Sequence, residues 1–196
     1  MAATEFEVLH AVRLGGFSST VAVAERAMAT EQSVEQTLRA LQRRGMVEFV
    51  DFAGTGGWTL TETGRERDAA LHAEEMAAPG VHPLVEETAT GFEQINPRMV
   101  RVVTDWQLAA PADRGAVRAR TIAELDALYT ELDDLMARLV PVLPRYRRYA
   151  RQFGAATGRA REGQDDAIAG VGTLSCHTVW AELHQDLVSG LGRERR

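Results

Sequence analysis

The chain has 196 residues, a mass of 21.5 kDa and a formal net charge of −6. Hydrophobic residues make up 45% and charged residues 26%, a globular composition that excludes a wholly disordered chain, a collagen-like chain and a disulfide scaffold. A single cysteine, no apolar run near the roughly 18 residues of a membrane span and no basic N-terminal leader lead us to expect a cytoplasmic protein without membrane contact.

Charge is distributed unevenly along the chain. All 22 basic residues are arginines, whose planar guanidinium groups suit phosphate, carboxylate and aromatic partners. Residues 1–78 hold 7 arginines and 12 acids, whereas the stretch from Arg138 to Arg161 holds seven arginines and no acid. The net charge therefore averages an acidic region and a basic one.

Residues 1–45 are predicted to form three short helices. Thr4 and Glu7 have the spacing of a capping box, and Gly15-Gly16 ends the first helix. A serine or threonine within 18–20 caps the second helix, and Thr30 caps a third that runs over 31–44. The third helix carries the apolar residues Val34, Leu38 and Leu41 at the spacing of a buried stripe.

After Gly45 the hydrophobic period changes. Residues 46–51 and 58–60 are rich in strand formers and flank the glycine-rich stretch 53–57, which predicts a β-hairpin. Thr61 or Thr63 then opens a helix through about residue 78. Three helices, a hairpin and a helix make a winged helix-turn-helix, so the fold class expected is mainly α with a small β-hairpin wing, followed by a helical bundle.

The same residues resemble a known family. The segment from Val34 through Leu41-Gln42-Arg43-Arg44-Gly45-Met46-Val47, followed by Trp58-Thr59-Leu60-Thr61-Glu62-Thr63-Gly64-Arg65, is similar to the recognition helix, wing and LTxxGR exit of MarR-like regulators. The resemblance implies a transcriptional regulator that binds DNA. Because one recognition helix covers only a half-site, a homodimer is expected.

The solvent face of the third helix is the predicted DNA contact. Glutamine can pair with adenine edges, serine and threonine with several base groups, and arginine with phosphates. The expected DNA-binding residues are Gln32, Ser33, Gln36, Thr37, Arg39, Arg43 and Arg44. Two features oppose this interpretation: the module is acidic, and its Ala-Gly-Thr-Gly-Gly turn carries no cation. A protein-contact role for the winged helix stays open.

Pro79-Gly80-Val81-His82-Pro83 predicts the domain boundary, which divides the chain into a DNA-binding domain (1–78) and a helical dimerisation and effector domain (79–196). Asn96-Pro97 has the pattern of a helix start over 98–109. A long helix is expected over 113–140, with Ile122, Leu125, Leu128, Leu132, Leu135 and Leu139 forming a near-heptad seam that suits an internal bundle or a dimer interface. Further helices are predicted over 145–161 and from Asp165 or Asp166 to about 191.

The basic stretch allows two interpretations. Arg145, Arg147, Arg148 and Arg151, with tyrosines between them, could form an anion-binding patch. Alternatively, the arginines of this stretch pair with acids elsewhere in the bundle, as Arg138 would with Asp134 one turn earlier.

Two segments, 104–107 and 175–187, concentrate tryptophan and histidine. Trp106, His177, Trp180 and His184 could line a small-molecule effector pocket, or could be ordinary core side chains. The two histidines stand seven residues apart, too far for a common metal ion, so neither a metal nor a cofactor is expected. Cys176 is expected to be buried and inert rather than a redox sensor.

These segments, "TDWQ" and "HTVWAELHQDL", also resemble the C-terminal region of actinobacterial proteins with a MarR-like front end. Some such regions are joined to phosphoenolpyruvate-utilising enzymes. The resemblance implies an alternative function, a regulatory or adaptor module that contacts a partner enzyme and not DNA. No phosphate loop, nucleophile elbow or HExxH motif is present in the sequence, so no enzymatic activity is expected.

Overall fold

The computed structural model describes residues 3–52 and 54–192. Within them the chain is mainly helical, with one two-stranded antiparallel hairpin, and it divides into two compact units. Unit 1 is Met1–Pro79 and unit 2 is Gly80–Arg196, so the division lies one residue after the predicted boundary. None of the helices in the described ranges combines the length and hydropathy of a membrane-spanning segment.

Unit 1 begins with three short helices, α1 (Glu5–Gly15), α2 (Thr20–Ala27) and α3 (Glu31–Arg43). The predicted capping box is present, because the Thr4 side chain accepts from the Glu7 amide and the Glu7 carboxylate accepts from the Thr4 amide. Ser19 and Thr30 cap the next two helices. The turn between α2 and α3 places Met28 in the left-handed region, at φ 50°.

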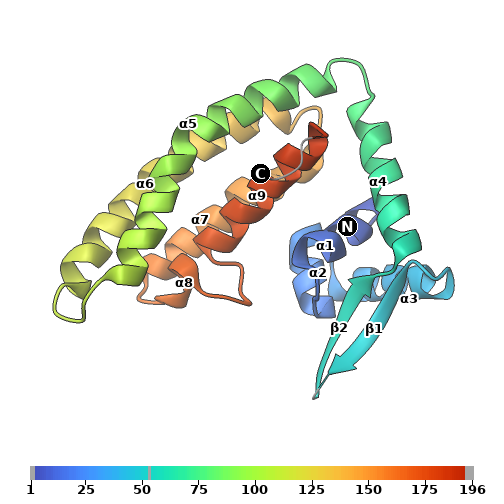
Figure 1. The fold of residues 1–196 in the computed structure, drawn as a ribbon, viewed down its shortest axis with the longest axis horizontal. Helices are drawn as coiled ribbons and strands as arrows, with labels where there is room; N and C mark the ends of the chain where they lie inside the picture. Colours follow the sequence, from blue (N-terminus) through green and yellow to red (C-terminus); the bar gives the residue numbers. More distant parts are fainter. Residues whose placement is uncertain (1–2, 53, 193–196) are drawn as a thin grey trace. The chain divides into compact units, whose positions relative to one another are not determined.

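A hairpin follows α3, formed by β1 (Val47–Phe52) and β2 (Thr55–Leu60) (Figure 1). The register pairs Phe52 with Thr55, so the connection is two residues long and β2 starts three residues earlier than predicted. Gly56 lies close to Phe49: a Cβ atom at Gly56 would be 2.4 Å from the Phe49 ring, so a larger residue would require this exposed ring to shift. Thr61 then caps α4 (Glu62–Met76), which closes the unit.

The core of unit 1 forms where α1, α2, α3 and the hairpin meet. Its members are completely or almost completely buried: Val8, Leu9, Val12, Val23, Val34, Leu38, Leu41, Val47, Trp58 and Leu60. The predicted stripe of α3 is thus confirmed as its inward face. Hydrogen bonds also connect Trp58 to the start of α2: its backbone pairs with Ser18, and its indole N–H donates to the Thr20 hydroxyl at 3.0 Å.

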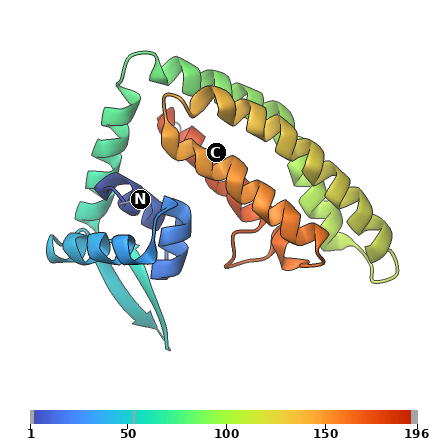
Figure 2. The ribbon, with the colours of Figure 1, turned by 180° about the vertical axis from the view of Figure 1, so that it is seen from behind.

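Over residues 80–192, unit 2 contains four long helices and two short ones. The long helices are α5 (Val81–Leu108), α6 (Arg114–Leu139), α7 (Arg147–Arg161) and α9 (Cys176–Gly190). The short ones are η1 (Pro144–Tyr146) and α8 (Asp166–Ala169). Helix α5 packs on α6 and α9, and α7 packs on the same two helices. Figures 1 and 2 both show α5 and α6 running side by side.

Two predicted helix boundaries in unit 2 are wrong. Asn96-Pro97 starts no helix: α5 runs continuously through it, although an internal proline costs about 3 kcal/mol. Burial of Ile95 and Met99 on either side holds the two halves on one core, and the Asn96 side chain accepts a hydrogen bond from Trp180. The last predicted helix is two helices, because the chain leaves helical geometry between α8 and α9 and Ser175 caps α9.

Most of the apolar seam of α6 is buried within unit 2. Leu125, Leu128, Leu132 and Leu139 are each fully buried, together with Met136. Ile122 and Leu135 are only half-buried, and the fully buried positions at that end are Val117 and Thr121. Because these leucines pack within one chain, most of the seam is an intramolecular interface, and only Ile122 and Leu135 remain partly exposed. The homodimer stays a prediction.

Candidate nucleic-acid interface

Helix α3 presents one polar strip to solvent. Its other face is anchored by Val34, Leu38 and Leu41, each no more than 1% exposed. The strip consists of Gln32, Glu35, Gln36, Arg39 and Arg43, which line a shallow surface depression. Four of these five residues are in the predicted DNA-binding set, so the structure brings Gln32, Gln36, Arg39 and Arg43 together on one solvent-facing surface.

Arg39 is the most constrained residue of the strip. Its guanidinium lies 3.6 Å from the Glu35 carboxylate, 3.5 Å from the Gln42 side-chain oxygen and 5.5 Å from the centre of the Trp58 ring. Arg43 donates to the backbone carbonyl of Arg39 at 3.4 Å. These contacts hold both guanidinium groups close to α3, where their remaining N–H donors stay available to a ligand.

Three predicted contact residues are engaged elsewhere in unit 1. The Ser33 hydroxyl accepts from the Ala3 amide at 2.8 Å, and the Thr37 hydroxyl donates to the Ser33 carbonyl at 3.1 Å, so both side chains face the N-terminal segment and are half-buried. Arg44 forms an ion pair with Glu5. Together with Arg67, it lowers the pKa of Glu5 below the ordinary value. Ser33 and Thr37 therefore lie beside Ala3 and off the open face of α3, whereas Arg44 is exposed and its guanidinium is engaged by Glu5.

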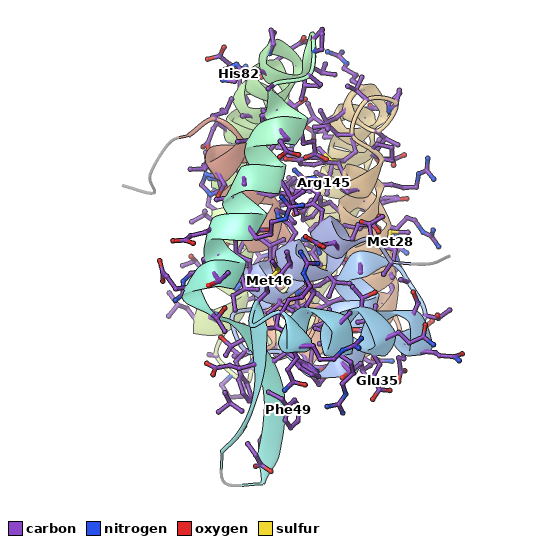
Figure 3. All side chains as sticks on the ribbon, turned by 90° about the vertical axis from the view of Figure 1, so that its right-hand side faces the viewer. Met28, Glu35, Met46, Phe49, His82 and Arg145 are labelled. Atoms are coloured by element: carbon purple, nitrogen blue, oxygen red, sulfur yellow. The ribbon has the colours of Figure 1, made fainter. Side chains whose placement is uncertain are left out.

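Glu35 and Phe49 are the residues that sequence reasoning missed. Glu35 stands four residues before Arg39, so its place on the strip could have been found from helical spacing. Phe49 is 47% exposed and packs edge-on against Trp58, with ring centres 5.1 Å apart. Figure 3 shows Glu35 on the side of α3 from which the hairpin projects, with Phe49 on that hairpin. The strip and the hairpin thus share one side of unit 1.

The hairpin itself carries no cation. Residues 47–60 contain the acids Glu48 and Asp51, both exposed, and neither arginine nor lysine. Phe49 and Val50 add exposed apolar surface. This part of the surface therefore repels phosphate and favours contact with apolar or basic groups.

The four residues predicted to line an effector pocket do not meet. Trp180 donates to Asn96 at 3.0 Å and packs on Phe92 and Phe153, with ring centres 4.8 and 5.5 Å away. Trp106 lies ten residues beyond Asn96 on the same helix, an axial distance of about 15 Å.

The two histidines of the predicted pocket also separate. The imidazole of His184 lies 2.8 Å from the Glu93 carboxylate, whereas His177 is exposed. Trp106 lies under the guanidinium of Arg114, 4.5 Å from the ring centre. Trp180 is therefore a core side chain, His184 pairs with Glu93 and His177 faces solvent, so the contacts do not bring the four residues together.

The predicted anion patch divides into two pairs. Arg147 and Arg151 are exposed, but Arg145 and Arg148 point into the bundle. Arg148 is 5% exposed and pairs with Glu182 at 3.1 Å; Arg145 pairs with Asp186, which is completely buried. The four arginines therefore form no continuous surface.

Two further arginines of the basic stretch pair with acids from distant parts of the chain. Arg138 pairs with Glu87 of α5 at 2.9 Å, and Arg161 pairs with Asp126 of α6. The Arg138 pair thus crosses to another helix, whereas the sequence suggested Asp134 on the same one. Pairing within the bundle is the interpretation that fits these contacts.

Cys176 is completely buried and hydrogen-bonded to the Thr157 hydroxyl at 3.5 Å. Burial raises the pKa of its thiol to about 11. At neutral pH the group is a thiol and not a thiolate, as expected for a structural cysteine.

No group of three or more histidine, cysteine, aspartate or glutamate side chains within 3–52 and 54–192 is placed to hold a metal ion. The exposed strip of α3 is therefore the candidate site that the contacts of unit 1 define best. Comparison with protein-family models, curated proteins and solved structures finds no match for this chain.

Proposed function

We propose that unit 1 is a winged helix-turn-helix module of a transcriptional regulator and that it binds double-stranded DNA through the exposed strip of α3. Helix α2 and helix α3 are separated by only three residues, 28–30, as in helix-turn-helix motifs. The hairpin that follows α3 has the position of a wing. In this arrangement α3 is the recognition helix.

The observation that carries the proposal is the composition of the strip. A helix of 13 residues is about 20 Å long and fits the major groove. Gln32 and Gln36 can pair with adenine edges, and Glu35 can accept from the amino group of cytosine. Arg39 and Arg43 supply cations for guanine or phosphate. Every side chain of the strip thus has a partner in duplex DNA.

The acidity of unit 1 limits the affinity that one module can have. Residues 1–78 carry a net charge of −5, and only two cations belong to the strip. Neutralising about two phosphates gives a logarithmic salt slope of roughly −2. We therefore expect tight binding only when two modules engage two half-sites, which requires a dimer.

The test is a fluorescence-anisotropy titration of the full chain with its own upstream DNA at 50 and 200 mM salt. Replacing Arg39 or Arg43 by Gln should weaken binding and reduce the salt slope by about 1 each. Arg65→Gln is the matched control, because Arg65 pairs with Glu62 on α4, outside the strip. Absence of binding at 50 mM salt, or equal losses in all three variants, would refute the proposal.

A second candidate function is contact with a partner protein. The resemblance to regions joined to phosphoenolpyruvate-utilising enzymes implies that this partner would be an enzyme. It is favoured by the acidic, partly apolar hairpin with exposed Phe49. The double variant Glu48→Gln and Asp51→Asn separates the two. If the hairpin approaches a DNA backbone, removing two negative charges should tighten DNA binding; if the hairpin docks on a protein, DNA affinity should be low in both forms.

A further inference from the structure

A groove of about 490 Å³ lies between α5 and α6, within unit 2. Its volume is within the range of small-molecule sites. Helix α5 contributes Arg98, Arg101 and Asp105, and helix α6 contributes Val117, Arg120 and Thr121. None of the residues predicted to form an effector pocket lines this groove, so it is a separate site.

Thr121 contributes a hydroxyl that is open to the groove. The residue is 4% exposed, lines the groove and makes no hydrogen bond within the described residues, and its hydroxyl oxygen is not among the fully buried atoms that lack a partner. Four other helical threonines of unit 2 donate to the carbonyl four residues earlier: Thr88, Thr90, Thr130 and Thr157. Thr121 does not form this local bond, so its hydroxyl can bond a ligand oxygen in the groove.

The arginines of the groove differ in what holds them. Arg98 is fixed by two carboxylates, Glu124 at 3.0 Å and Glu131, and this pairing raises its pKa. Arg101 and Arg120 make no ion pair or hydrogen bond within the described residues. Arg101 on α5 and Arg120 on α6 line the groove from its two helices, and Thr121 follows Arg120 on α6. Two guanidinium groups without an ion pair in the described part of the chain thus share the groove with the Thr121 hydroxyl.

The charge of the groove restricts the ligand to a small anion. Arg98 is already paired with Glu124 and Glu131, so Arg101 and Arg120 are the lining cations without an ion pair in the described residues, and Asp105 is the remaining lining acid. A single carboxylate can bond these two guanidinium groups, whereas a multiply charged phosphate would be repelled by Asp105 and Glu124. Guanidinium groups bind carboxylates through paired N–H donors.

The floor of the groove is apolar. Val102 of α5 and Val117 of α6 are 6% and 8% exposed and lie below the charged rim, and Ala123 completes the lining. An apolar body attached to the carboxylate would cover this surface and lose contact with water.

We propose that the α5–α6 groove binds a small organic acid, whose single carboxylate is held by Arg101, Arg120 and the Thr121 hydroxyl and whose aliphatic body lies over Val102 and Val117. The inference does not depend on DNA binding by unit 1. Its test requires no DNA, so the two proposals can fail separately.

The experiment is calorimetric titration of the full chain with sodium octanoate below its micellar concentration, compared with hexanoate, octanol, octylamine and inorganic phosphate. Octanoate should bind most tightly. Each fully buried CH₂ should improve affinity about fourfold, so octanoate should exceed hexanoate by up to roughly 15-fold. Absence of octanoate binding, or tighter binding of phosphate, octanol or octylamine, would overturn the proposal.

Variants locate the site. Arg101→Gln and Arg120→Gln should each weaken octanoate binding roughly tenfold or more, and the near-isosteric Thr121→Val should weaken it several-fold. Arg151→Gln is the matched control, because Arg151 is an exposed arginine of α7 outside the groove. Thermal unfolding confirms that each variant is folded. Losses as large for Arg151→Gln as for Arg101→Gln would place the acid elsewhere and refute the assignment.

Discussion

The exposed strip of α3 and the buried arginines of η1 and α7 show how little local sequence charge says about surface charge. Unit 1 is acidic, yet Arg39 and Arg43 stand at its surface on one helix face. The stretch from Arg138 to Arg161 holds seven arginines, yet Arg145 of η1 and Arg148 of α7 are inside the bundle. The difference arises because acids of α9 pack against these two arginines, whereas the outer face of α3 is exposed.

The buried pair of α7 and α9 should give the largest effect. Arg148→Ala removes the guanidinium that pairs with Glu182, a carboxylate 5% exposed, so we expect a loss of about 3–5 kcal/mol in the free energy of unfolding, measured by urea denaturation. Arg147→Ala removes the adjacent exposed arginine and should change stability by less than about 0.5 kcal/mol. Equal losses in the free energy of unfolding for the two variants would contradict the distinction between the buried Arg148 and the exposed Arg147. Replacing the pair together, Arg148→Met with Glu182→Leu, should recover much of the loss.

A substitution at Tyr149 should have a smaller effect on the same buried network. Its hydroxyl donates to Asp186 at 2.7 Å and accepts from Arg148 at 2.7 Å, and burial raises its pKa well above the ordinary value. Tyr149→Phe keeps the ring but leaves a buried carboxylate with one donor fewer. We expect a loss of about 1–3 kcal/mol in urea unfolding. The matched control is Tyr129→Phe, because Tyr129 is half-exposed. This variant should hardly change the free energy of unfolding.

The strip of α3 should behave in the opposite way. Arg39→Gln and Arg43→Gln remove exposed guanidinium groups whose partners lie on the same helix, so each should alter the free energy of unfolding by less than about 0.5 kcal/mol. The same variants are expected to weaken DNA binding. If urea denaturation shows that either variant costs more than 1 kcal/mol, the strip has a structural role and the comparison with α7 fails.

Glu5 should give a small, pH-dependent effect on stability. Hydrogen bonds from Arg44 and then Arg67 lower its pKa, so its contribution to stability is complete above the ordinary value of 4.5 and is lost as pH falls through the lower folded-state pKa. Because the group is partly exposed, the contribution is at most about 1 kcal/mol. Glu5→Gln should reduce the unfolding free energy at pH 7 and have no effect at pH 2. Equal effects at both pH values would contradict the assignment.

The secondary structure of unit 1 was largely predictable because its signals are local. A cap such as Thr4 with Glu7 or Thr30 acts within one helical turn, and the stripe of Val34, Leu38 and Leu41 lies on one short helix. The exposed positions Gln32, Gln36, Arg39 and Arg43 follow from the same spacing. Ser33 and Thr37 could not be placed in this way, because their partner Ala3 is distant in sequence.

In unit 2 the sequence determined which segments are helical and that Cys176 lies in an apolar neighbourhood, because periodicity and composition act along a single helix. Only the tertiary structure decided that α5 continues through Pro97, that Arg145 and Arg148 turn inward, and that Arg101, Arg120 and Thr121 face one groove. Each of these outcomes depends on residues 20 or more positions apart, such as Trp180 with Asn96 or Arg148 with Glu182. Ion pairing and burial depend on which element packs against a helix, and the sequence pattern within one helix does not identify that element.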